Sequence, residues 1–294
     1  MFDKIVVGFA GDQDGRDAVT LAGRLAAGLS SHVTIVLPYN PLLAELPAAE
    51  AREYARGQVQ ELVADIDRLP TLTYRSTSAR WPIHALHDVA SKEKADLIVF
   101  GAAREGLAAH MHVNLVERML HRAPCAVAIA PSGYAERDHG GLHRIGVGLS
   151  DSQEGRAALH LAYELAGHVA GELEVISSSG VNATLASYAF SSALLPQFED
   201  EMYDEAKAKL ERTESELGDN VQIDLKPIRG DAHTALIKCS ANLDMLMLGS
   251  HAYGPLRNAV LGSFSAAVIR EAHCPVLVVP RSALGSAAFT ETQA

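Results

Sequence analysis

Residues 4–26 read KIVVGFAGDQDGRDAVTLAGRLA, a short apolar run that leads through Gly and Asp into a longer segment with helical spacing. The run after Lys4 is apolar almost throughout, which is typical of a strand buried on both faces of a sheet. Apolar residues from Ala18 to Leu25 then recur at i, i+3, i+4 and i+7 and form one stripe of a helix. The stretch therefore predicts a buried strand followed directly by a helix that packs on the sheet.

The same pattern returns 140 residues later, where residues 151–166 read DSQEGRAALHLAYELA. Two further blocks keep the order: ADLIVFG (95–101) matches LDMLMLG (243–249), and RAPCAVAIAP (122–131) matches EAHCPVLVVP (271–280). Matches that keep their order over three separate blocks indicate an internal duplication. Strands and helices alternate in each half, which predicts an α/β fold with a mainly parallel sheet and helices on both faces.

The duplication divides the chain into two expected domains, residues 1–131 and 143–280, joined by a linker at 132–142. Residues 281–294 are small and polar, so we expect a disordered tail. In the second half we expect strands at 144–149, 171–177, 221–228, 243–248 and 275–279, and helices at 153–168, about 196–217 and 232–241.

Composition excludes several classes of protein. A net charge of −11 lacks the basic surface that nucleic-acid binding needs. The three cysteines, Cys125, Cys239 and Cys274, are too few for a disulfide framework and suit a reducing compartment. No apolar run reaches the roughly 18 residues of a membrane span, and the start of the chain is not typical of a signal peptide. We therefore expect a soluble cytoplasmic protein with neither nucleic-acid nor membrane partners.

The stretch GSHAYGPLRNAVLGSFS (249–265) follows a buried strand, at the end of the strand where open parallel sheets bind ligands. Its glycines allow tight turns, and a Gly-Ser pair then begins an apolar helix. The free N–H groups and positive dipole end of such a helix attract an anion such as phosphate. A plain turn with Ser263 as an ordinary helix cap is the alternative reading. The residues expected to form an anion site are Gly249, Gly254, Gly262, Ser263 and Ser265.

The tandem repeat, the strand-end GSHAYGPLRNAVLGS and the following HCPVLVVP resemble the universal stress protein family. ATP-binding members of that family carry G-x2-G-x9-G-[ST] after the fourth strand, where it holds the triphosphate. Gly249 matches the first glycine, Gly262 and Ser263 end the motif, and Ala252 stands at the middle glycine position.

The resemblance also implies an architecture. Each half is expected to form a five-stranded, mainly parallel sheet in the order 3-2-1-4-5. Members of the family pair their last strands across a dimer, so we expect the apolar runs 126–131 and 275–280 to join the halves as an internal pseudo-dimer. A homodimer of the whole chain is left open.

Two departures from the family pattern restrict the expected site to the second half. Family members usually have an Asp at the end of the first strand, where this chain has Ala10 and Ser150, the latter followed by Asp151. In the first half, Val113 and Asn114 stand where the second half has its Gly-Ser pair, and a β-branched side chain hinders contact between backbone and phosphate. The resemblance thus implies one ATP with Mg²⁺, its phosphates on Gly249, Ser250, Gly262 and Ser263, and its ribose and base near Ser150 and Asp151.

Three alternative functions remain open. Regulatory, non-catalytic ATP binding in a stress response is favoured by the retained glycines. A nucleotide-free scaffold for protein–protein association is favoured by Ala252 and by the missing first-strand Asp. A slow ATPase or hydrolase is disfavoured, because nothing supplies a positioned general base. We expect a binding protein that is not an enzyme.

Other reactive residues receive structural interpretations. His84 and His87 lack a metal-binding spacing, and we expect no metal site. Cys125 and Cys274 are equivalent and are expected to pack in the core. Ser150 lies in GLSDS, which lacks the last Gly of a nucleophile elbow. The charged helix near 198–216 pairs Glu205 with Lys209 and Lys207 with Glu211 at i, i+4, which predicts a solvated face.

Overall fold

The computed structural model describes residues 1–39, 48–62, 71–78, 82–102, 116, 118–120, 123–137, 141–180, 195–250 and 263–285. The first half contains β1 (Lys4–Gly8), α1 (Gln13–Leu29), β2 (His32–Tyr39), α2 (Ala48–Leu62), β3 (Thr71–Ser78), α3 (Pro82–Glu93), β4 (Leu97–Gly101), β5 (Ala126–Ala130) and the 3-10 turn η1 (Tyr134–Glu136). The second half contains β6 (Arg144–Gly148), α5 (Gln153–His168), β7 (Glu172–Ser178), α7 (Leu195–Glu216), β8 (Gln222–Ile228), α8 (Ala232–Ser240), β9 (Met245–Gly249), α9 (Ser263–Glu271), β10 (Val276–Val279) and the 3-10 turn η2 (Arg281–Gly285).

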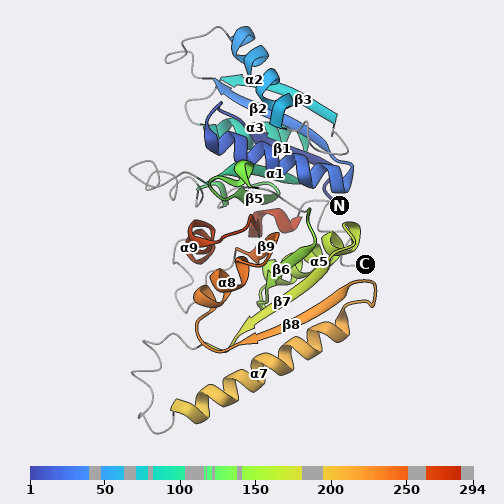
Figure 1. Cartoon of the computed structure of the whole chain (residues 1–294), viewed down its shortest axis with the longest axis vertical. Coiled ribbons are helices and arrows are strands. Elements are labelled where there is room, and N and C mark those ends of the chain that lie inside the picture. The colour runs from blue at the N-terminus through green and yellow to red at the C-terminus, as the bar shows by residue number, and fades with distance from the viewer. Residues whose placement is uncertain are drawn as a thin grey trace.

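The strands form one sheet of ten in the order β3-β2-β1-β4-β5-β10-β9-β6-β7-β8 (Figure 1). Within each half the order is 3-2-1-4-5 and the pairings are parallel. The α/β fold expected from the sequence, with two repeats of this order, is confirmed.

The two halves meet at β5 and β10, which pair antiparallel with Leu277 opposite Ala128. Val276 pairs with Ile129, and Val278 pairs with Val127. The apolar runs at the ends of the two repeats therefore lie side by side in the sheet. This is the pairing of last strands that the family resemblance implies. It covers the edge that β5 and β10 would each leave open if the halves were apart.

Helices cover both faces of the sheet. One hydrophobic cluster lies beneath α1, α2, α5 and α7, and a second lies beneath α3, α8 and α9. Each cluster contains buried residues from both halves, so the core runs without a break across the β5–β10 junction. None of the described helices is long and apolar enough to span a membrane.

The linker is folded where it is described. Pro131 begins a turn into η1, and the fully buried carboxylate of Asp17 on α1 accepts hydrogen bonds from the N–H groups of Gly133 (2.8 Å) and Ala135 (2.7 Å). Arg137 then donates to the carbonyl oxygen of His273 in the second half, at 2.6 Å. The segment after the first half is therefore bound to both halves.

The prediction of a disordered tail is wrong for its first five residues, because residues 281–285 form η2. Ser282 donates its hydroxyl hydrogen to the carbonyl oxygen of Ala123 in the first half at 2.7 Å, and Ala283 is fully buried. The polar composition that predicted disorder includes residues whose polar groups find partners here. Residues 286–294 lie outside the described part of the chain.

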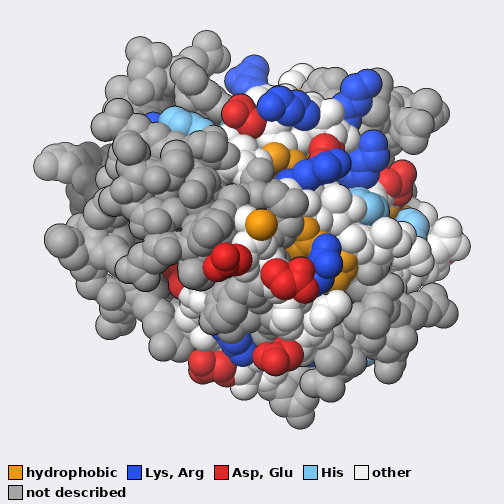
Figure 2. All heavy atoms as spheres, turned by 90° about the horizontal axis from the view of Figure 1, so that it is seen from above, with side chains coloured by type: hydrophobic (Ala, Val, Ile, Leu, Met, Phe, Trp, Pro, Cys, Tyr) orange, Lys and Arg blue, Asp and Glu red, His pale blue; other side chains and the backbone are white. Residues whose placement is uncertain are grey.

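The outer edges of the sheet are β3 and β8. The view onto the β3 end of the molecule shows charged side chains of both signs and few apolar ones on the described surface (Figure 2). The edge strand β8 carries Asp224, Lys226 and Pro227. Charged side chains and Pro on an edge strand hinder pairing with a further strand.

Candidate functional site

A cavity of about 630 Å³ lies at the carboxyl ends of β6, β7 and β9. Because β7 and β9 flank β6 on opposite sides, it occupies the point where the strand order reverses, which is where open α/β sheets bind ligands. The described wall consists of Gly148, Leu149, Ser150, Asp151, Ser152, Ile176, Ser177, Ser178, Gly180, Met202, Lys209, Ala232, Ala235, Leu236, Leu248, Gly249 and Phe264. The volume falls within the range of roughly 300–1,000 Å³ that small-molecule sites occupy.

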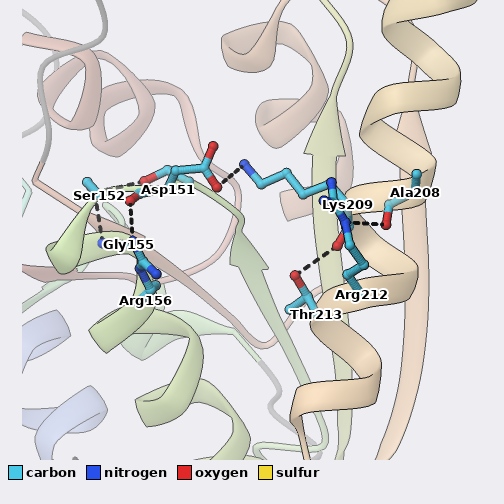
Figure 3. Close-up of polar contacts among 9 residues, drawn as sticks. Asp151, Ser152, Gly155, Arg156, Ala208, Lys209, Arg212 and Thr213 are labelled. Carbon is cyan, nitrogen blue, oxygen red and sulfur yellow. Dashed lines mark hydrogen bonds and ion pairs between the residues drawn. The ribbon is translucent and has the colours of Figure 1, made fainter.

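One wall of the cavity is the turn between β6 and α5. Ser152 caps α5, and its hydroxyl oxygen accepts a hydrogen bond from the N–H of Gly155 at 2.9 Å (Figure 3). The hydroxyl oxygens of Ser150 and Ser152 lie 2.9 Å apart and form a hydrogen bond. A Cβ at position 155 would lie 2.2 Å from Ser150 Oγ and 2.7 Å from the backbone carbonyl oxygen of Ser150, so a residue larger than Gly would force the turn to shift. Ser150, which the sequence predicts at the site, lines the cavity, and so does Ser152, which the sequence does not single out.

An ion pair joins this turn to α7 across the cavity wall. Lys209 Nζ lies 2.9 Å from Asp151 Oδ1, and both residues line the cavity (Figure 3). The Lys209 side chain is 25% exposed, whereas that of Asp151 is 86% exposed. The i, i+4 spacing predicts Glu205, on the same helix, as the partner of Lys209 and gives no sign that Lys209 lies at the cavity. The other ion pair expected on this helix does form, with Lys207 Nζ 4.0 Å from Glu211 Oε1.

Gly249 lines the cavity, but close packing accounts for it as well. A Cβ at this position would lie 2.5 Å from the backbone nitrogen of Gly155. In the first half, a Cβ at Gly101 would lie 2.1 Å from the carbonyl oxygen of Asp14. Both glycines therefore let the fourth strand of a half approach the start of that half's first helix. This explains why Gly101 persists where the Gly-Ser pair is absent.

Ser250 and Ser265, which the sequence predicts at the site, are buried and are not among the described lining residues of the cavity. The N–H of Ser250 donates to the carbonyl oxygen of Val279 at 3.0 Å, and its hydroxyl oxygen accepts from the N–H of Arg281 at 3.2 Å. The N–H of Ser250 is therefore engaged within the chain, whereas its hydroxyl keeps its own hydrogen to donate. Ser265 is buried in the first turn of α9, is not part of the described cavity wall, and its Oγ has no hydrogen-bond partner in the described structure.

The remaining expected site residues are Ser263, at the start of α9, and three residues that come before it in the sequence. Ser263 is the first residue of α9, a helix whose Phe264 lines the cavity. Ala252, Gly254 and Gly262 lie outside the described residues.

The cysteines behave as packed side chains. Burial raises the pKa of both Cys125 and Cys274 to about 12, and Cys239 reaches about 11, again chiefly through burial. Thiols of this kind stay protonated near neutral pH, so they are poor nucleophiles. The described residues contain no group of three or more His, Cys, Asp and Glu side chains that could hold a metal ion.

Comparison with known proteins agrees with the architecture. The sequence profile of the universal stress protein family matches residues 1–131 and 141–280. A universal stress protein from Mycobacterium tuberculosis is 25% identical over 94% of this chain and 99% of its own length. Another from Methanocaldococcus jannaschii is 33% identical over 39% of this chain and 74% of its own length.

A solved structure shares the whole architecture. The crystal structure of a universal stress protein from Archaeoglobus fulgidus superimposes with a TM-score of 0.64, covering 95% of this chain and 96% of that one. At 16% sequence identity this likeness speaks for the fold alone.

Proposed function

The chain belongs to the universal stress protein family, and from this premise we propose that its second half binds a nucleotide, ATP with Mg²⁺, as a regulatory ligand in a stress response. The observation that carries the proposal is the cavity of about 630 Å³ at the strand-order reversal. Its described wall combines an apolar part with hydroxyl groups and one cation, which is the mixture that a base, a ribose and a phosphate chain need.

The described side chains fit such a ligand. Met202, Leu236 and Phe264 offer apolar surface for a base, and Ser150 and Ser152 offer hydroxyls to a ribose. Lys209 is the cation of the described wall. Mg²⁺ is usually held by ligand phosphates, waters and one or two carboxylates, and Asp151 is the carboxylate available to it here.

Binding without turnover is favoured by the same wall. Among the described lining residues, Asp151 is the one carboxylate, and no histidine is present. A single carboxylate with no histidine beside it provides no acid–base pair for hydrolysis among these residues. We propose that the ligand changes the conformation or the partner affinity of the protein and is not consumed.

Calorimetric titration of the full chain with Mg·ATP tests the proposal, together with a variant that fills the cavity. Ala232 lines the cavity in the first turn of α8, so Ala232→Phe should abolish binding by occupying ligand space. Ala241→Phe places the same side chain at an exposed position at the far end of α8 and should bind normally. Gly262→Val, at the expected phosphate loop, should also abolish binding while leaving the fold intact.

The stoichiometry supplies a second criterion. We expect one nucleotide per chain, because the first half has Val113 and Asn114 where the second has its Gly-Ser pair. If the purified protein neither binds Mg·ATP nor releases a nucleotide on denaturation, the proposal is wrong. The nucleotide-free scaffold would then be the better account.

A further inference from the structure

We propose that Lys209 recognises the anionic part of the ligand and that Asp151 competes with the ligand for it. The pair would then make the cavity selective for charged nucleotides over neutral nucleosides. This inference rests on the proposed function and names the residue that sets its specificity.

The geometry places both groups at the cavity from separate elements. Asp151 comes from the turn between β6 and α5, and Lys209 comes from the middle of α7. Their side chains point toward one another across the space between these elements, with Nζ and Oδ1 2.9 Å apart (Figure 3). No other residue of the described wall carries a charge.

The position of Lys209 is fixed by its helix. Residues around it form regular α-helical contacts, with Thr213 Oγ1 donating to the Lys209 carbonyl oxygen at 2.9 Å (Figure 3). Leu210, the next residue, is fully buried in the core, so α7 cannot turn the lysine away from the cavity without exposing Leu210. The ammonium group therefore stays within reach of a ligand while its flexible stem can change partner.

Lys209 can leave Asp151 for another anionic partner at little cost in free energy. The Asp151 side chain is 86% exposed, and ion pairs with an exposed member add little to stability because water and salt screen them. A phosphate offers the ammonium group several strong acceptor oxygens, and charge-assisted hydrogen bonds of this kind are among the stronger ones in proteins. A phosphate should therefore displace Asp151, whereas a neutral nucleoside should not.

Binding of ATP and of adenosine, measured with EDTA present so that Mg²⁺ does not involve Asp151, tests the competition. Lys209→Met keeps most of the apolar stem and should weaken ATP binding about tenfold or more while leaving adenosine binding unchanged. Lys209→Arg should retain most of the ATP affinity. Asp151→Asn should strengthen ATP binding, by no more than about fivefold because the pair is partly exposed.

The matched control is Lys207→Met, which removes the same charge from an exposed position on the same helix, where the lysine pairs only weakly with Glu211. It should change neither affinity. The double variant Asp151→Asn with Lys209→Met should bind ATP like Lys209→Met alone, since the competitor has then lost its target.

The outcomes separate this inference from the proposed function. The inference is wrong if Lys209→Met weakens the binding of ATP and of adenosine equally, or if Asp151→Asn weakens the binding of ATP. Either result would mean that the ion pair only stabilises the shape of the cavity. If the natural protein binds ATP and Lys209→Met binds it equally well, the inference fails and the proposed function stands. If the natural protein binds Mg·ATP but neither ligand in EDTA, Lys209 is not the group that holds the phosphates and the inference fails. If the natural protein does not bind Mg·ATP either, both fail.

Discussion

At the scale of single residues, Gly101 and Gly249 show how backbone contact constrains a position, and Gly249 also lines the cavity. Each lies at the end of the fourth strand of its half, against the first turn of the helix after the first strand. The space that a Cβ would need is already filled by backbone atoms of that helix, and backbone cannot yield as a flexible side chain does. Their presence is therefore no measure of ligand binding in either half.

We predict that Gly101→Ala and Gly249→Ala each lower the free energy of unfolding by about 2 kcal/mol or more, because the new methyl group overlaps backbone. Urea denaturation measures the change. Gly57→Ala is the control, since it lies within α2 with open space around its Cβ position, and it should raise stability by about 0.5–1 kcal/mol. Unchanged stability of Gly249→Ala would show that the helix can shift to admit the methyl group.

The ion pair of Lys209 with Asp151 shows at the same scale what sequence reasoning misses. The i, i+4 rule considers neighbours within one helix, so it could offer Lys209 only Glu205. The partner that it finds is 58 positions earlier in the chain, in a turn brought near by the packing of α7 over β7 and β8. Asp17 and the linker residues that it binds are likewise more than a hundred positions apart. Contacts of this range leave no local pattern.

At the scale of elements, the sequence predicts well where helices and strands lie. The helix expected at 153–168 is observed as Gln153–His168, and its start is explained by the cap that Ser152 provides. Strand ends agree within one or two residues, because continuous apolar runs mark strands buried on both faces. The sequence does not predict the two 3-10 turns, because their stability comes from contacts with the opposite half and with α1 and not from their own composition.

The cap of α8 provides a test at this scale. Asp231 accepts a hydrogen bond from the N–H of Thr234 at 3.1 Å, and hydrogen bonding to Thr234 lowers the pKa of the carboxyl below its ordinary value of 3.8. We predict that Asp231→Ala lowers the free energy of unfolding by about 1 kcal/mol at pH 7. Asp219→Ala, an exposed substitution in the turn before β8, should have little effect.

The dependence on pH follows from the direction of the shift. A carboxyl whose pKa is lower in the folded protein contributes stability that is complete above its unfolded pKa and is lost as the pH falls through its folded pKa. The difference between the natural protein and Asp231→Ala should therefore be constant from pH 7 down to about pH 5. It should shrink as the pH falls below 3.8. A difference that does not change down to pH 3 would contradict the role of the carboxylate.

At the scale of the whole molecule, the continuous core makes the two halves one structural unit. Both hydrophobic clusters contain residues from each half, and β5 and β10 join the sheet between them. The segments that follow these strands reinforce the junction, since Arg137 bonds to the second half and Ser282 to the first. The family resemblance, together with two apolar runs, predicts the strand pairing, but it does not predict the reciprocal bonds beside it.

We predict that the natural protein unfolds in one calorimetric transition, with equal calorimetric and van't Hoff enthalpies, because neither half can lose its core alone. Leu277→Asp should separate the halves, since it buries an unpaired carboxylate opposite Ala128 at the junction. The scan should then show two transitions or the early loss of one half. Thr71→Asp, on the exposed edge strand β3, is the control and should keep a single transition.

The junction between β5 and β10 has a consequence for how the protein responds to its own abundance. Two separate chains that meet through their last strands obey mass action, so the paired form is lost on dilution. Here the partners are tethered by a short segment, which replaces bulk concentration by a local one that does not change with expression level. Pairing of the repeats is thus independent of dosage. The two repeats can also differ in sequence, as they do at Val113 and Asn114, which stand where the second half has Gly262 and Ser263, without risk of selecting the wrong partner.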